Sequence, residues 1–195
     1  MHPEKLTSSW TKFRGAGQDK KHSKREELPG MSIFNEIYNR SEAEGNRIVC
    51  AYVKSGYDVN AKHYNGKSLL FAAASMGLAD GVRKLIAAGA DINTAHDGYT
   101  PLLVALGNGE FEVCKVLIQA KADVNLRVTR SGQSALSLAA ERGLKDIVLL
   151  LLRAKADIGS TDNKGLTALD HATRNGHAEV VELLTMARKP RWKFW

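Results

Sequence analysis

Histidine and cysteine are the residues in this chain whose chemistry could support a metal site or catalysis. Two of the six histidines, His63 and His96, are 33 residues apart and occupy nearly equivalent positions of a repeated unit. Stacked helices lie ~8–10 Å apart, which is too far for two such side chains to share one metal ion at ~2.1 Å. We therefore predict that both are surface histidines, that the chain binds no metal and that it needs no cofactor.

The two cysteines, Cys50 and Cys114, lie far apart in the chain. In the repeat register described below, Cys114 falls on the core side of its segment and Cys50 on the outer side, so a shared metal or a disulfide is not expected. This cysteine usage is typical of a reducing compartment. We expect a cytoplasmic protein, with the nucleus as the alternative location.

No sequence motif of a known catalytic site is found. The chain has no phosphate-binding glycine loop, no HExxH and no nucleophile elbow, and the GAG at Gly15–Gly17 has no strand before it. Aspartates such as Asp58 and Asp91 are placed as turn formers. We predict that the protein is not an enzyme.

Charge is concentrated at the two ends of the sequence. The net charge is +7, of which residues 1–30 carry +3 and residues 188–195 carry +4, while residues 31–187 are neutral. No apolar run approaches the ~20 residues that a membrane helix needs, and the first 30 residues lack the apolar segment of a secretory signal. The basic character therefore belongs to the tails and not to the body.

Each tail allows several interpretations. KKHSKR at Lys20–Arg25 could be a solvated linker, which we favour, a nuclear localisation patch or a phosphate-binding arm. RKPRWKFW, at 188–195, interleaves bases with Trp192, Phe194 and Trp195. Such a segment suits stacking on nucleic acid, a membrane surface, or folding back over the end of the protein.

The body of the chain repeats itself. GYDVN, GADIN, KADVN and KADIG place an aspartate at 58, 91, 123 and 157, at intervals of 33, 32 and 34. Glycines at 66, 98, 132 and 165 form a second marker, and glycines at 77, 109, 143 and 176 form a third, always 11 residues later. Only the distance from the aspartate to the second marker varies. We expect that segment to be a surface loop and the segments of constant length to be packed.

The chemistry of each unit predicts two helices followed by a loop. Ser68, Thr100, Ser134 and Thr167 are residues that cap helix N-termini, and Pro101 fits the first helical position. The third-marker glycines suit the end of a helix, where positive φ is needed. Apolar residues spaced as in Val82, Leu85 and Ile86 then predict a second helix.

These features resemble the ankyrin repeat, whose TPLHxA signature is matched best by TPLLVA at Thr100–Ala105. The resemblance implies an all-α repeat solenoid of about five stacked repeats, of which the first and last are caps. We predict a repeat domain over 31–187, divided at 31–60, 61–93, 94–125, 126–159 and 160–187. A disordered basic segment, 1–30, precedes it, and a basic, aromatic tail, 188–195, follows it.

The resemblance also implies that the protein binds other proteins through its hairpin tips and the inner face of its first helices. A stack with a small rotation per repeat forms an extended concave surface, and Tyr and Arg are favoured in interface hot spots. The predicted partner-binding residues are Tyr64, Asn65, Lys67, Met76, His96, Tyr99, Asn108, Arg127, Arg130, Gln133, Arg142, Lys164 and Arg174.

We therefore predict a monomeric, non-catalytic adaptor, scaffold or inhibitor whose partner protein offers an acidic segment. The alternatives are a nucleic-acid-associated or nuclear regulator that uses the basic tails, and a membrane-surface adaptor that uses the C-terminal tail.

Overall fold

The computed structural model describes residues 29–38, 40–63 and 65–188, with the side chains of residues 29–32 and 35 excepted. The predicted disorder of residues 1–28 and the roles suggested for residues 189–195 lie outside the described residues.

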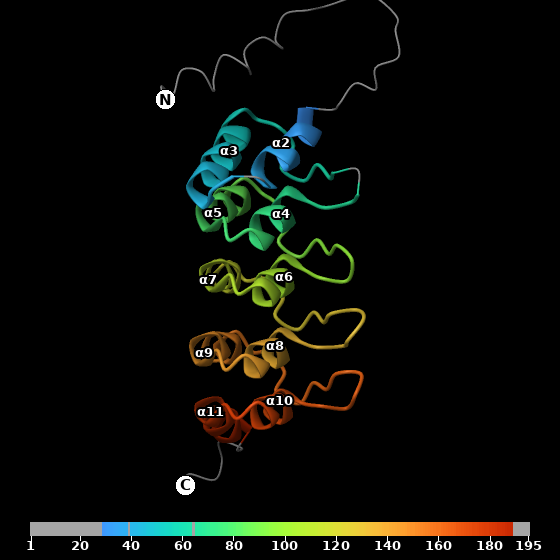
Figure 1. Ribbon diagram of the computed structural model, residues 1–195, viewed down its shortest axis with the longest axis vertical. Coiled ribbons are helices and arrows are strands. Elements are labelled where there is room, and N and C mark those ends of the chain that lie inside the picture. Colours follow the sequence, from blue (N-terminus) through green and yellow to red (C-terminus); the bar gives the residue numbers. More distant parts are fainter. Residues whose placement is uncertain (1–28, 39, 64, 189–195) are drawn as a thin grey trace, which may run out of the picture.

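Ten helices form in the described residues, as five helix pairs stacked along one axis (Figure 1). The pairs are α2 (Pro29–Tyr38) with α3 (Glu42–Lys54), α4 (Leu69–Ser75) with α5 (Ala79–Ala87), α6 (Pro101–Asn108) with α7 (Phe111–Gln119), α8 (Ala135–Glu141) with α9 (Lys145–Arg153), and α10 (Ala168–Arg174) with α11 (Ala178–Arg188). First helices form one layer and second helices another, and a long loop projects from the first-helix side between successive pairs (Figure 1). The described chain is thus an all-α repeat solenoid, as predicted.

The predicted caps begin four of the first helices. The side-chain oxygens of Ser68, Thr100, Ser134 and Thr167 each accept a hydrogen bond from the backbone N–H three residues later. Pro101 occupies the start of α6, where its missing N–H has no intrahelical partner to lose. The short helices are therefore delimited by local sequence.

The boundaries of the repeat domain differ slightly from those predicted. The repeat domain was predicted to begin at residue 31, whereas helix α2 already begins at Pro29. Proline suits the first turn of a helix, so it marks a start here and not an interruption. At the other end, Arg188 is the last residue of α11 and not part of the tail.

Small residues let the helix pairs approach closely. Ala73, Ala105, Ala139 and Ala172 occupy the same position in successive repeats, and each is fully buried. Around them, buried leucines and valines form one continuous core along the stack. The structure therefore has no internal domain boundary between the described repeats.

Asparagine side chains join successive loops. Asn60, Asn93 and Asn125 follow the repeated aspartates by two residues, and their Oδ1 atoms accept the backbone N–H of Asp91, Asp123 and Asp157 at 2.8, 3.0 and 2.9 Å. The equivalent residue of the fourth repeat is Gly159, and no fifth segment of this kind follows α11 within the described residues. The repeated aspartate segment of the sequence thus both forms a turn and links neighbouring repeats.

Candidate functional site

The predicted surface consists of two sets of residues. The first set lies in or beside the loops and consists of Asn65, Lys67, His96, Tyr99, Arg127, Arg130, Gln133 and Lys164. Short antiparallel bridges, such as the one between Lys62 and Ser68, make these loops hairpin-like. Met76, Asn108, Arg142 and Arg174 lie at the ends of the first helices. Tyr64 lies outside the described residues.

The two histidines expected at the surface are largely buried, so that prediction is wrong. His63 is 8% exposed, its ring centroid lies 4.8 Å from that of Phe34, and its Nδ1 is 2.9 Å from Oδ1 of Asn65. The side chain of His96 is 12% exposed and packs edge-on against Phe71 at 5.3 Å. Each loop folds its histidine back onto a neighbouring first helix, which the sequence spacing alone does not indicate.

Several of the predicted partner-binding residues also join parts of the protein itself. Nδ2 of Asn108 donates to the carbonyl oxygen of Ser75 at 2.8 Å, and a guanidinium nitrogen of Arg142 donates to the carbonyl oxygen of Gly107. Each bond satisfies a carbonyl at the end of the preceding first helix, which has no intrahelical partner. Nε of Arg127 donates to the carbonyl of Gly132 within its own hairpin at 2.8 Å.

Other members of the set are partly buried. Met76 and Tyr99 pack against the core. Nζ of Lys67 lies 3.5 Å from the hydroxyl of Tyr38 and 5.6 Å from the centre of its ring. Oδ1 of Asn65 accepts the backbone N–H of Lys67 at 3.2 Å, which shapes the turn. Lys67, Met76 and Tyr99 therefore offer only part of their surface to a ligand.

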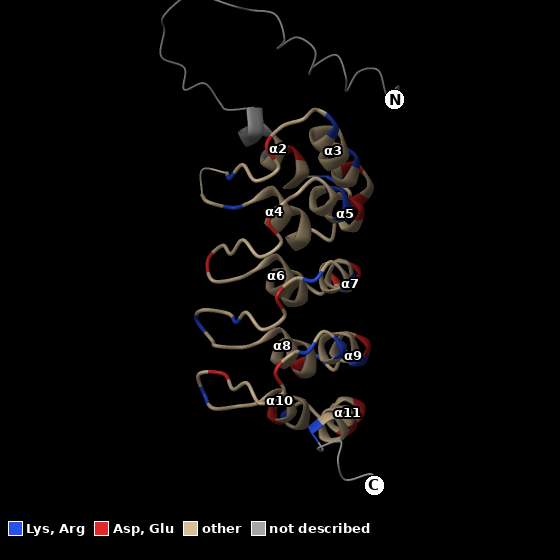
Figure 2. Cartoon of the chain, turned by 180° about the vertical axis from the view of Figure 1, so that it is seen from behind, with Lys and Arg blue, Asp and Glu red and all other residues tan. Residues whose placement is uncertain are grey.

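Arg130, Lys164 and Arg174 remain as exposed cations in the last two repeats. Arg130 and Lys164 occupy the tips of successive hairpins, and Figure 2 shows Lys and Arg at the tips before α8 and α10. Among the described residues, the charged groups of Arg130 and Lys164 form no hydrogen bond or ion pair. After the hydrogen bonds from Thr167, Arg174 helps to lower the pKa of the Asp170 carboxyl. The tip before α6 carries the exposed acid Asp97 instead. Positive charge at the hairpin tips is therefore not uniform along the stack.

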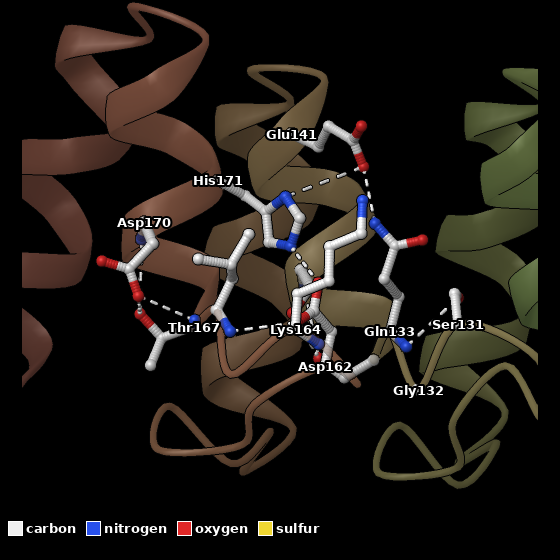
Figure 3. A network of polar contacts seen from close by, with 12 residues as sticks. Ser131, Gly132, Gln133, Glu141, Asp162, Lys164, Thr167, Asp170 and His171 are labelled. Carbon is white, nitrogen blue, oxygen red and sulfur yellow. Dashed lines mark hydrogen bonds and ion pairs between the residues drawn. The ribbon is translucent and has the colours of Figure 1, made fainter.

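A buried polar network holds the last hairpin against α10 (Figure 3). Nε2 of His171 lies 3.0 Å from Oδ2 of Asp162, and both side chains are at most 10% exposed. Oδ1 of Asp162 accepts the backbone N–H groups of Lys164 and Leu166 at 2.8 and 2.9 Å. The hydrogen bond from Leu166 is the main cause that lowers the pKa of Asp162. This hairpin is therefore fixed by an ionised carboxylate.

The network continues into the preceding repeat. Oε2 of Glu141 lies 4.0 Å from Nδ1 of His171 and accepts a hydrogen bond from Nε2 of Gln133 at 2.8 Å. Neither Asp162 nor His171 was among the site residues predicted from the sequence. A usable signal was that Asp162 occupies the hairpin position that His63 and His96 occupy in earlier repeats, where a polar side chain is buried.

The thiol of Cys114 is fully buried, and its burial raises its pKa to about 12. A thiol that stays protonated is neither a nucleophile nor a metal ligand at neutral pH. Among the described residues there is no group of three or more His, Cys, Asp or Glu side chains that could hold a metal ion.

Stacked helix pairs with projecting hairpins define a repeat protein. The family model for ankyrin repeats (3 copies) matches residues 41–128 and 124–190. The chain belongs to the ankyrin-repeat family. Members of this family generally bind other proteins and are generally not catalytic.

Curated relatives share the repeats over part of their length. The chain is 37% identical over 121 residues to human "Ankyrin repeat and SOCS box protein 16", covering 62% of this chain and 26% of the relative. It is 40% identical over 94 residues to mouse "Ankyrin repeat domain-containing protein 63", covering 46% and 24%. It is 34% identical over 119 residues to the rice "Probable E3 ubiquitin-protein ligase XBOS31", covering 59% and 26%. The chain thus spans about a quarter of the length of each of these relatives.

No helix in the described residues is both long and apolar enough to cross a membrane.

Proposed function

We propose that this chain is a non-catalytic adaptor, scaffold or inhibitor that binds a partner protein through its hairpin tips and the inner face of its first helices. An acidic segment of the partner docks on the last two described repeats. The supporting observation is that Arg130, Lys164 and Arg174 are exposed there, and that the charged groups of Arg130 and Lys164 have no hydrogen-bond or ion-pair partner among the described residues.

Electrostatics favours this assignment of roles. Exposed charges across an interface raise the association rate more than they raise the affinity. The cations therefore steer the acidic segment toward the surface, whereas the partly buried Met76 and Tyr99 contribute apolar contact. The side chain of Arg142, which bonds Gly107, contributes charge while it stabilises the stack.

A charge-reversal experiment tests the proposal. The full chain and its Arg130→Glu, Lys164→Glu, Arg174→Glu variant serve as baits in affinity purification from the native cell. The matched control reverses three exposed cations of the second helices, Lys54, Lys84 and Arg153, and so makes the same change in net charge. We expect a partner that the control retains and the tip variant loses. A partner retained equally by all three baits would contradict the proposed surface.

The proposal includes a monomeric chain located in the cytoplasm or the nucleus. Light scattering of the purified full chain tests the first statement, and microscopy of a fluorescently tagged full chain tests the second.

A further inference from the structure

The last described repeat leaves apolar side chains partly uncovered. Leu70, Leu102 and Leu136 occupy one position of the first helix and are at most 1% exposed, because the following repeat covers them. Their counterpart Leu169 is only partly buried. In the second helix, Val82, Cys114 and Val148 are each 0% exposed, whereas their counterpart Val181 is only partly buried. Leu169 and Val181 form what we call the end face.

Acidic residues flank the end face. Asp170, next to Leu169, is exposed, whereas the equivalent Leu103 and Ser137 are buried. Glu182, next to Val181, is also exposed. These polar residues suit an end that meets water, yet they leave the two apolar side chains between them open. The end face therefore presents an apolar centre with negative charge beside it.

The residues that follow α11 match this face in chemistry. Residues 189–195 read KPRWKFW and carry three cations and three aromatic side chains. Aromatic residues bury large apolar areas. Glu182 and Asp170 carry the charge opposite to that of the cations, and Oδ2 of Asp170 also accepts hydrogen bonds from Thr167. Pro190 disfavours continuation of the helix, because proline lacks the N–H that the helical hydrogen bond needs.

The connection also has the required length and direction. α10 and α11 are joined by a three-residue turn, so they run antiparallel and the start of α10 lies beside the end of α11. Leu169 is the second residue of α10 and Arg188 the last of α11. Seven extended residues reach about 23 Å, while neighbouring helix axes lie about 8–10 Å apart. The segment is therefore long enough to cross both helices.

We infer that residues 189–195 fold back over the end face, with the aromatic side chains on Leu169 and Val181 and the cations beside Asp170 and Glu182. The segment then serves as the C-terminal cap of the described solenoid. This inference is independent of the partner-binding proposal, which concerns the hairpin tips and the inner face.

Tryptophan fluorescence tests the inference in the full chain. A Trp10→Phe background leaves Trp192 and Trp195 as the two reporters, since the chain has three tryptophans. We expect the folded chain to emit at shorter wavelength than the same chain in urea and to be protected from acrylamide quenching. Replacing both end-face residues, Leu169→Ser with Val181→Ser, should abolish that protection while circular dichroism still reports the helices.

Met186→Ser provides the matched control. Met186 is 60% exposed, but its counterpart Arg153 is exposed even though another repeat follows it, so this position does not belong to the end face. The control should keep the protection. As a second measurement, deletion of residues 189–195 should lower Tm by about 2–4 °C and raise hydrogen exchange in α10 and α11.

Three results would overturn the inference. Quenching in the folded chain equal to that in urea would place the tryptophans in solvent. An unchanged Tm and exchange pattern after the deletion would show that the segment covers nothing. Protection that depends on protein concentration, with a rise in mass by light scattering, would indicate that a second copy covers the end face instead.

Discussion

Oδ1 of Asn125 accepts a hydrogen bond from the backbone N–H of Asp157 at 2.9 Å, across the boundary between two repeats. Asn125→Ala removes this acceptor, and we expect the free energy of unfolding to fall by about 1 kcal/mol. Urea denaturation followed by circular dichroism measures it. At the equivalent position of the fourth repeat, Gly159→Asn should match Gly159→Ala, because no aspartate segment follows α11 in the described chain to donate to the new side chain. A higher free energy of unfolding for Gly159→Asn than for Gly159→Ala would contradict this role of the asparagine side chain.

Two lysines occupy left-handed backbone conformations that glycine occupies elsewhere. Lys121 and Lys155 have φ of 64°, whereas the equivalent Gly56 and Gly89 have φ of 72° and 89°. A side chain in this region costs roughly 1–2 kcal/mol, and glycine loses roughly 0.5–1 kcal/mol of chain entropy in exchange. We expect Lys121→Gly to stabilise the protein by about 0.5 kcal/mol, measured by urea denaturation.

Lys84→Gly is the opposite case. Lys84 lies on the exposed side of helix α5, where glycine costs about 1 kcal/mol. The two lysine-to-glycine changes should therefore have opposite signs, and equal destabilisation by both would count against the assigned backbone conformation.

Gly132 and Gly165 are equivalent glycines with φ of 72° and 76°. A Cβ at Gly132 would clash with Oδ1 of Asn163 and would lie 2.9 Å from the backbone nitrogen of Asn163, while nothing lies within 4 Å of a Cβ at Gly165. Both alanine variants incur the backbone cost, but Gly132→Ala adds a clash with the next hairpin. We expect Gly132→Ala to destabilise the protein by about 1–3 kcal/mol more, as measured by thermal melts. Similar losses for both would mean that the hairpins do not stack as described.

Arg142 and Arg130 were predicted from the sequence as equivalent contacts for a partner, but their environments differ. Arg142 bonds the carbonyl of Gly107, whereas the Arg130 side chain has no such bond in the described residues. We expect Arg142→Ala to lower the free energy of unfolding by about 1 kcal/mol and Arg130→Ala to change it by less than about 0.5 kcal/mol. Urea denaturation of the two variants in parallel measures these changes. Equal changes in the free energy of unfolding would contradict a stabilising role for the hydrogen bond from Arg142 to Gly107.

Asp162 makes the free energy of unfolding depend on pH in the acid range. Its folded pKa lies below the ordinary value of 3.8, chiefly because the backbone N–H of Leu166 donates to the carboxylate. A depressed folded pKa contributes stability that is present above the unfolded pKa and is lost as the pH falls through the folded pKa. Asp162→Asn keeps an oxygen acceptor but does not titrate. Urea denaturation below the ordinary carboxyl pKa should show a shallower loss for this variant than for the parent, and equal slopes would refute the role.

Local features of the fold were predictable, and contacts between repeats were not. The caps at Thr100 and Thr167 and the helix-ending Gly109 act within a few residues of themselves, so residue type and spacing suffice. The burial of His63 depends on Phe34, 29 residues earlier, and the role of Arg142 depends on a carbonyl 35 residues earlier. The repeat pattern indicated which of the predicted surface residues lie in loops. Which of their side chains are engaged inside the protein depends on contacts between repeats, which the spacing does not indicate.

Several links between repeats have one property in common: a side chain of one repeat bonds the main chain of its neighbour. Asn60 bonds the backbone of Gly89 and Asp91, and Nδ2 of Asn163 bonds the carbonyl of Arg130. Main-chain groups are the same whatever residue carries them, so these links do not constrain the side chain of the residue they bond. Arg130 can therefore be exchanged without loss of the bond that its carbonyl accepts. Selection can thus alter what the hairpin tips recognise while the assembly of the stack is left intact.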